Sequence, residues 1–478
     1  MKMLINGKQV GASDKTEMEI INPYTGTVID TVPNATAKDV DTAVKSAHKA
    51  FPAWANVPLT KKVDLLKKFL ELVDANKQDL AMTLCKETGK PITQALAEIG
   101  NIRIGFEAFM EKAKHIYGEV IPAGQEAGND KTLQFTLREP MGVVAAIIPF
   151  NFPCDLFDQK VAPALLAGNT VVVKPPHQNP LTLIKLVELL HLAGVPKNVV
   201  HIVTGEGAKS GNALASHPLV HKITFTGSTP VGIKTYQNAA SHLAHISLEL
   251  GGNDAFIVLN DADLNLAVEE MVWGRMYNNG QVCCASKRFL VQKDIVDKFV
   301  AKAKARLAKL VVGDPTKKTT EMSCLVTEHA AKVVEQQIKK AIEQGGKLIC
   351  GGKRKGAYIP PTIISNIPKT ADVAIDEEIF GPVVSIIPFS TVKEAIEIAN
   401  ASTFGLCGCV FTKDIKTAFN VVTKLECGGT VINGASFFRS FEMPFGGYKF
   451  SGIGTEGVLS TFNEVTKIKT VVLKNILD

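Results

Sequence analysis

Short apolar segments alternate with helical segments along much of this chain, and the alternation limits the folds that it can adopt. Residues 143–148, 170–173, 199–203 and 223–225 are apolar or β-branched at nearly every position. A strand with one wetted face alternates polar and apolar residues, whereas a parallel strand covered by helices on both faces is apolar throughout. Residues 181–193, between two of these segments, have a helical pattern and can provide such cover. The sequence therefore predicts an α/β fold with a parallel sheet.

A second set of strands begins near residue 255, and the strand–helix pattern continues over 283–434. Because 478 residues exceed what one ordinary core holds, we expect two or more domains with a boundary around residue 251. Residues 60–116 have apolar positions spaced by three and four, which predicts helices with one buried face.

Two further segments, 127–140 and 464–473, are β-prone, the first with weak alternation of apolar residues. Strand edges need cover, so we expect both segments to form arms that pair with another subunit. Surface hairpins of a monomer are the alternative.

The composition excludes several classes of function. The chain is 46% hydrophobic and 21% charged, as is usual for globular proteins, and its net charge of +6 is mild for this length. Its basic residues are scattered and form no stripe with interleaved aromatic residues, which argues against nucleic-acid binding. The chain lacks both a run of about 18 apolar residues and an apolar N-terminal region, so we expect no membrane span and no signal peptide.

The nine cysteines are scattered through the sequence. An odd, scattered set in a long chain argues for reduced thiols and a cytoplasmic location. Cys407 and Cys409 have no partner pair or nearby His, so we expect them on a strand and predict no metal site.

Cys283 is a candidate nucleophile. Gly280 permits a sharp turn before it, and Asn279 and Gln281 are polar in an otherwise apolar region. A cysteine is more commonly a small buried hydrophobe, and we assign that role to the adjacent Cys284.

Glu249 is a candidate general base. It lies between Leu248 and Leu250, just before two glycines, in a segment too apolar for the surface. A desolvated carboxyl group has a raised pKa, which suits a base that works near neutral pH. Most Glu residues are instead solvated surface groups.

Asn151 lies at the carboxyl end of the segment 143–148, between two aromatic and two proline residues. Ligands bind at this end of open α/β sheets, and a rigid turn can hold an amide N–H where it stabilises an oxyanion. The alternative is an ordinary turn Asn.

A phosphate-binding helix start is expected at residues 227–232, because main-chain N–H groups at such a position favour anions. Lys174 ends another predicted strand and is placed to reach a ribose hydroxyl. Residues 205–207 (Gly-Glu-Gly) lack a helix directly behind them and are predicted to form a loop.

Together these segments resemble the aldehyde dehydrogenase superfamily over nearly the whole chain. The motifs that carry the resemblance are, in chain order, PFNFP, KPP, FTGSTPVG, LELGG, NNGQVC, EEIFGP and MPFGGYKFSG. The resemblance implies a Rossmann-like cofactor domain of residues 1–117 and 139–250 and a catalytic domain of residues 251–434. It also implies a small β oligomerisation arm of residues 118–138 and 456–478 that joins a homodimer or homotetramer.

The resemblance also implies a catalytic mechanism. The thiolate of Cys283 attacks a small-molecule aldehyde, and Asn151 with the main-chain N–H of Cys283 stabilises the oxyanion. A hydride passes to a nicotinamide cofactor, and Glu249 then activates the water that hydrolyses the thioester. Lys160 matches a position linked in the family to proton relay with the base.

The cofactor contacts are implied in the same way, for NAD or NADP. Lys174 contacts the adenosine ribose in this scheme. The pyrophosphate is flanked by Gly227, Ser228 and Gly232. The nicotinamide ribose and ring are held by Glu378 and Phe380.

Two positions depart from the family pattern. NAD-preferring members often carry Glu at the position of His177, where a carboxylate repels a 2′-phosphate. His177 removes that repulsion and could bond the phosphate, so we expect NADP to be accepted and leave the use of NAD open. Phe150 replaces the commoner Trp beside the substrate and is expected to widen the pocket.

The region around Cys283 is similar to succinate-semialdehyde dehydrogenases, and residues 437–447 are similar to lactaldehyde and glyceraldehyde-type relatives. Arg439 lies where the family has its substrate loop, and a guanidinium group there would pair with an anionic aldehyde. The alternative for Arg439 is a surface salt bridge to Glu442. We therefore expect a small polar or anionic substrate.

Two other functions remain open at the level of sequence. One is a coenzyme A-acylating aldehyde dehydrogenase, although acylating relatives often lack the carboxylate of Glu249. The other is a catalytically silent binding protein of the same fold, which the presence of both Cys283 and Glu249 disfavours.

Overall fold

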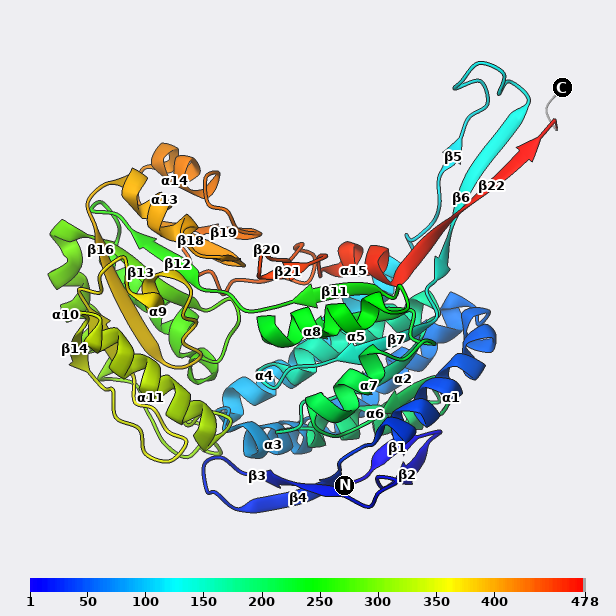
Figure 1. Cartoon of the computed structure of the whole chain (residues 1–478), viewed down its shortest axis with the longest axis horizontal. Helices are drawn as coiled ribbons and strands as arrows, with labels where there is room; N and C mark the ends of the chain where they lie inside the picture. Colours follow the sequence, from blue (N-terminus) through cyan, green and yellow to red (C-terminus); the bar gives the residue numbers. More distant parts are fainter. Residues whose placement is uncertain (476–478) are drawn as a thin grey trace.

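The computed structural model describes residues 1–475, and its first large sheet is built mostly from residues before 250 (Figure 1). The strand order is β2-β1-β9-β8-β7-β10-β11-β21. Strands β7 to β11 pair in parallel, whereas β1, β2 and β21 pair antiparallel with their neighbours. The strands are β1 (Met3–Ile5), β2 (Lys8–Val10), β7 (Val143–Ile147), β8 (Thr170–Lys174), β9 (Val200–Ile202), β10 (Lys222–Thr226), β11 (His245–Glu249) and β21 (Gly452–Ile453).

Helices cover both faces of this sheet, which confirms the predicted α/β class. Successive residues of β7 enter opposite cores: Val143 and Ala145 pack on one face, Val144 and Ala146 on the other. The first face is covered by α1 (Ala37–Ala55), α7 (Asn212–Ala215) and α8 (Thr229–Ala240). The second is covered by α2 (Leu59–Ala75), α3 (Lys77–Thr88), α4 (Ile92–Ala113), α5 (Pro153–Ala167), α6 (Leu181–Leu192) and α15 (Val458–Val465). The helices predicted over 60–116 and 181–193 are therefore confirmed.

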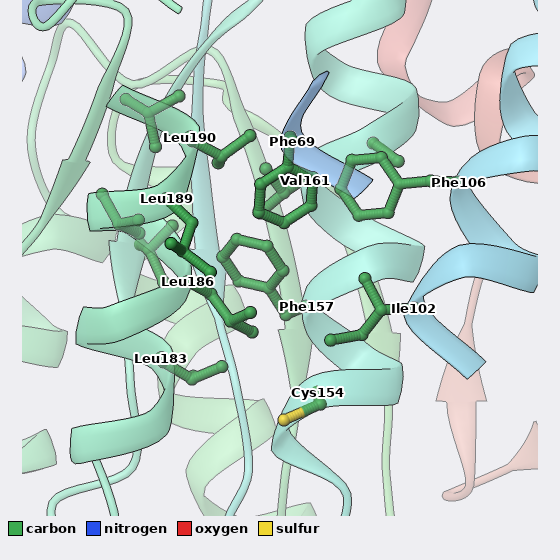
Figure 2. Close-up of a cluster of buried hydrophobic side chains, with 14 of the residues drawn as sticks. Phe69, Ile102, Phe106, Cys154, Phe157, Val161, Leu183, Leu186, Leu189 and Leu190 are labelled. Carbon is green, nitrogen blue, oxygen red and sulfur yellow. The ribbon is translucent and has the colours of Figure 1, made fainter. Parts of the chain in front are cut away.

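The larger of these two cores is a close-packed cluster of aromatic and aliphatic side chains (Figure 2). Phe157 of α5 lies between Leu186 of α6 and the aromatic pair formed by Phe69 and Phe106. The centroids of these two rings are 5.0 Å apart. This core fixes α5, whose N-terminal turn follows Asn151, against the sheet.

The second large sheet has the order β14-β15-β16-β13-β12-β18-β19 and is parallel except for β14. Its strands are β12 (Asp254–Val258), β13 (Ser286–Gln292), β14 (Lys347–Cys350), β15 (Thr362–Ser365), β16 (Val383–Phe389), β18 (Cys407–Phe411) and β19 (Gly429–Ile432). Helices α9 (Leu264–Met276) and α10 (Val296–Leu307) cover one face. The other is covered by α11 (Glu328–Glu343), α12 (Asp372–Ile375), α13 (Val392–Asn400) and α14 (Ile415–Val422).

The chain passes from the first sheet to the second between Glu249 and Asp254.

Cys407 and Cys409 lie on β18, as expected, and their side chains belong to different hydrophobic clusters. Smaller elements are the hairpin β3 (Glu17–Ile21) and β4 (Val28–Pro33), the pair β17 (Phe404–Gly405) and β20 (Tyr448–Lys449), and the 3₁₀ turns η2 (Tyr277–Gly280) and η3 (Lys293–Ile295). No helix among residues 1–475 is long and apolar enough to cross a membrane.

A projecting arm contains β5 (Val120–Ile121), β6 (Thr132–Pro140) and β22 (Thr466–Lys474) (Figure 1). β22 pairs antiparallel with β6 from one end to the other. The predicted arm segment 456–478 is wrong in its first part, because the apolar face of α15 packs into the first core with Val458 and Phe462. Its residues 476–478 lie outside the described chain.

Residues 205–207 also differ from the prediction. A π-helical turn, η1 (Gly207–Gly211), begins directly behind Glu206, and α7 continues it. The main-chain N–H of Ser210 donates to the Glu206 carbonyl at 2.9 Å, which closes this turn without a recognisable capping residue.

The core in Figure 2 gives a first prediction. Leu186→Ala should lower the free energy of unfolding by about 2–5 kcal/mol, because the fully buried side chain leaves a cavity. Leu192→Ala, on the same helix but 73% exposed, is the matched control and should change it by less than about 0.5 kcal/mol. Urea unfolding followed by tryptophan fluorescence measures both, and equal effects would contradict the packing described.

Candidate active site

The predicted site residues from the first sheet gather at one edge of it. Asn151 follows β7, Lys174 ends β8, Gly227 follows β10 and Glu249 ends β11. Because these strands are parallel, their carboxyl ends meet. The main-chain N–H of Gly227 donates to the Glu249 carbonyl at 3.0 Å, so the predicted phosphate-binding turn and the predicted base are joined directly.

The turn before Cys283 requires an unusual backbone. Asn278, Asn279 and Gly280 have positive φ angles of 50°, 57° and 80°. A Cβ atom on Gly280 would lie 2.3 Å from the carbonyl carbon of Gly381, so only glycine fits there. This explains why the sequence places glycine three residues before the candidate nucleophile.

Side chains of the turn fix it to a neighbouring segment. The Asn279 amide donates to the Cys324 carbonyl at 2.7 Å and accepts from the Ser323 N–H at 2.6 Å. Gln281 accepts from the Val326 N–H at 2.9 Å. The polar residues in this apolar region therefore hold the shape of the turn.

The Cys283 thiol lies in an environment that favours its ionised form. A hydrogen bond from the Cys284 thiol lowers the pKa of Cys283 to about 7; burial opposes the shift, and the charges of Lys287 and Arg439 add to it. Cys284 is buried as expected for a packing residue, but it also contacts the candidate nucleophile.

Glu249 is buried and unpaired. It is 5% exposed, and neither carboxylate oxygen has a hydrogen-bond partner within residues 1–475. Burial, together with the negative charge of Glu456, raises the pKa of Glu249 well above its usual range. A carboxyl group in this state can hold a proton at neutral pH and has both oxygens free for water.

Glu456 joins two cations beside Glu249. Its carboxylate accepts from the Lys160 ammonium at 2.8 Å and from the Arg439 guanidinium at 2.8 Å. Burial opposes ionisation, but the two cations lower the pKa of Glu456 to about 2. The alternative of a surface salt bridge between Arg439 and Glu442 is wrong, because Arg439 pairs with the buried Glu456 instead.

A second buried ion pair positions Asn151. The main-chain oxygen of Asn151 accepts from Lys90 at 2.8 Å and from the Asn278 amide at 2.9 Å. Lys90 pairs with Glu98, which also accepts from the Cys154 N–H at 2.8 Å. The sequence analysis missed Lys90 and Glu98, although a carboxylate on the apolar face of α4 is a signal that could have found Glu98.

Further polar groups near this cluster lie on α5. Both carboxylate oxygens of Asp158 and the amide oxygen of Gln159 are buried and have no hydrogen-bond partner in the described chain. Burial raises the pKa of Asp158, and burial with the charge of Glu98 raises the pKa of Asp155 to about 7. The charge of Arg439 opposes both shifts, so the predicted substrate residue lies among acids as well as cations.

The proposed cofactor residues of the first sheet are suited to a dinucleotide. Helix α8 begins at Thr229 behind Ser228, and the Ser228 side chain makes no capping hydrogen bond to the first N–H groups of the helix. A Cβ atom on Gly232 would lie 2.4 Å from Cδ2 of Leu250, so a larger residue would displace the Leu250 side chain. Lys174 is 4% exposed, and burial lowers its pKa to about 7.

The proposed nicotinamide residues approach the nucleophile from the second sheet. Glu378 accepts from the Gly252 N–H at 3.2 Å and lies 3.0 Å from the Lys287 ammonium. The ring of Phe380 meets that of Phe150 edge-on, with centroids 5.8 Å apart. The structure therefore brings the predicted cofactor and substrate residues together.

His177 lies closer to the protein surface than the buried Lys174. It is exposed and lines a cavity of about 1210 Å³ together with Glu206, Tyr24 and Lys355. Both a carboxylate and an ammonium group line this cavity with His177, so its local charge is mixed. In the described part of the chain, no group of three or more His, Cys, Asp or Glu residues is arranged to hold a metal ion.

The model of the aldehyde dehydrogenase family matches residues 10–471. The chain belongs to the aldehyde dehydrogenase family. The resemblance inferred from the seven motifs is thereby confirmed.

Similar proteins include both enzymes and solved structures. Glutarate-semialdehyde dehydrogenase of Pseudomonas putida KT2440 is 39% identical over 97% of this chain and 96% of its own length. Succinate-semialdehyde dehydrogenase [NADP(+)] GabD of Escherichia coli K12 is 37% identical over 98% and 96%. The crystal structure of betaine aldehyde dehydrogenase from Staphylococcus aureus in complex with NAD+ has a TM-score of 0.95 at 33% identity and covers 100% of this chain and 95% of its own.

The environment of Cys283 gives a second prediction. The rate of alkylation by iodoacetamide should rise with pH and reach half its maximum near pH 7, because the thiolate is the reacting form. Cys283→Ala should remove the fast-reacting thiol. A midpoint near the ordinary thiol value of 9.0 would contradict the environment described.

Proposed function

We propose that this chain oxidises a small polar or anionic aldehyde to its carboxylic acid with NAD or NADP, through a thioester on Cys283. One observation carries the proposal: a thiol with a lowered pKa lies beside a buried carboxyl group with a raised pKa and no partner. Paired groups whose environments push their pKa values in opposite directions are typical of nucleophile and base assignments.

In the first half of the reaction, the Cys283 thiolate forms a bond to the aldehyde carbon. The side-chain amide of Asn151 and the main-chain N–H of Cys283 stabilise the oxyanion. The Lys90 and Asn278 contacts to the Asn151 carbonyl hold that loop in place, so little reorganisation is needed when charge develops.

The bound cofactor would supply the oxidant by accepting a hydride. Lys174, Gly227, Ser228 and Gly232 would hold its adenosine and pyrophosphate part, and His177 would lie near the 2′ position. Glu378 and Phe380 would hold the nicotinamide part. The free N–H groups at the start of α8 and the close packing at Gly232 support this assignment.

In the second half, Glu249 accepts a proton from the water that attacks the thioester. Its own proton must leave first, because its pKa is raised by burial and by Glu456. Two observations support a role for Lys160 in this proton transfer: its charge acts on Glu249, and its ammonium donates to Glu456. Hydrolysis should therefore become faster as pH rises.

The substrate class is supported by the relatives, two of which are named for semialdehydes that carry a carboxylate. The polar groups of α5 and the Arg439 guanidinium also support a polar substrate, since they favour aldehydes that form hydrogen bonds over long alkyl aldehydes. We further propose that the arm joins two or four copies, supported by exposed apolar residues on β22 such as Ile468 and Val472.

Initial rates of nicotinamide reduction on an aldehyde panel test the proposal. The panel contains succinate semialdehyde, lactaldehyde, glyceraldehyde, glyceraldehyde 3-phosphate and hexanal, each with NAD and with NADP. We expect the free acid as product without coenzyme A, and a higher kcat/KM for a small polar or anionic aldehyde than for hexanal.

Glu249→Gln is the matched control, because it keeps the size of the side chain and removes the base. It should retain a first turnover and lose steady-state rate by about 10²-fold or more. Product that forms only with coenzyme A would favour the acylating alternative. No turnover under either condition would favour the catalytically silent one.

Arg439 gives a separate prediction about specificity. If Arg439 binds the substrate anion, Arg439→Ala should lower the kcat/KM ratio of succinate semialdehyde to hexanal by about tenfold or more, since a charge-assisted contact is lost. Because loss of Arg439 also changes the environment of Glu456, it can alter kcat/KM for both aldehydes equally. The ratio of the two kcat/KM values cancels such an effect. Arg306→Ala, which breaks a surface pair with Glu269, is the control, and an unchanged ratio in Arg439→Ala would refute the role.

A further inference from the structure

Lys287 is a buried cation between the nucleophile and the proposed nicotinamide segment. Its side chain is 1% exposed. Its ammonium donates to the main-chain carbonyl of Cys283, lies 3.0 Å from the Glu378 carboxylate and lies 5.9 Å from the centre of the Phe380 ring. Three groups thus share one desolvated charge, and two of them come from a segment far from Cys283 in the sequence.

The position of Lys287 makes these contacts specific. It is the second residue of β13, which starts just after the Cys283 turn, so its backbone is fixed by the second sheet. Glu378 also accepts from the Gly252 N–H, at the crossing between the two sheets. Lys287 therefore links the Cys283 turn, the EEIFGP segment and the crossing.

We propose that Lys287 is a positioning residue that holds the Cys283 main chain against Glu378 and stabilises the thiolate of Cys283. The proposal rests on the role proposed above for Cys283 as the nucleophile. A buried positive charge close to a thiol favours the thiolate form, and the contact with the Cys283 carbonyl keeps the Lys287 charge at a fixed place.

Other groups around the Cys283 thiol do not supply this effect in the same way. The titratable groups that act on it or on which it acts are Cys284, Lys287, Arg439, Glu378, Glu249, Asp254 and Cys407. Only Lys287 and Arg439 are cations, and Arg439 is already paired with Glu456. Cys284 contributes a neutral hydrogen bond, and the remaining groups are acids that oppose ionisation of the thiol when charged.

The test is the pH dependence of Cys283 alkylation by iodoacetamide in the full chain, without aldehyde or cofactor. Lys287→Gln keeps a donor for the Cys283 carbonyl and removes the charge. For Lys287→Gln we expect the midpoint of the pH profile to rise by about one pH unit. At a pH below the midpoint, the alkylation rate should therefore be about tenfold lower. Lys287→Arg should stay close to the unmodified protein. Lys298→Gln, at an exposed position of α10, makes the same change in net charge and should leave the midpoint unchanged.

An unchanged midpoint in a folded Lys287→Gln protein, as judged by thermal unfolding, would overturn the proposal. If that variant does not fold, the double variant K287Q/E378Q, which removes both members of the buried ion pair, decides by comparison with Glu378→Gln alone. The midpoint of the double variant should lie above that of Glu378→Gln, and equal midpoints would overturn the proposal. Because the assay needs no turnover, a protein that oxidises no aldehyde but shows the Lys287 shift refutes the proposed function alone. Turnover without the shift refutes this inference alone.

Discussion

The ion pairs of Glu456 with Lys160 and Arg439 organise the candidate site. After the second sheet is complete, the chain returns to the edge of the first sheet as β21 and then continues into α15. This return places the Glu456 carboxylate between the buried Lys160 ammonium and the partly exposed Arg439 guanidinium. The buried Lys160 ammonium and Glu456 carboxylate would each be unstable in the interior without an oppositely charged partner. The loop that carries Arg439, which is the predicted substrate loop, is thereby tied to α5, which carries Lys160.

This cluster also creates the contrast between the two carboxylates. Glu456 is ionised because cations contact it, and its negative charge adds to burial in raising the pKa of Glu249. The same cations lie within reach of Glu249 but give it no hydrogen bond. Removal of either cation would therefore affect the protonation of Glu249, the candidate base, as well as the local packing. Substitutions at Lys160 and Arg439 need substrate ratios or pH profiles to separate these effects.

Much of the fold could be predicted from the sequence, because it depends on local periodicity. The continuous apolar segments at 143–148 and 170–173 form strands β7 and β8, and the pattern over 60–116 forms α2 to α4. The candidate nucleophile, base and amide were found because glycine and apolar neighbours surround them. The end of the chain was misassigned at 456–465, since an amphipathic helix beside a β-prone tail does not reveal which surface it covers.

What the sequence did not reveal are the buried charges that hold the motifs in place. Lys90, Glu98 and Lys287 belong to no motif. Glu98 has a sequence signal in its place on the apolar face of α4, whereas the two lysines resemble solvated surface residues. Their partners are the Asn151 carbonyl, the Cys154 N–H and Glu378, which lie far from them in the sequence and come close only when the chain folds. The chemistry of the site is thus encoded locally, whereas its geometry depends on ion pairs between distant segments. A variant that keeps all seven motifs and loses one of these lysines would keep its reactive groups and lose their alignment.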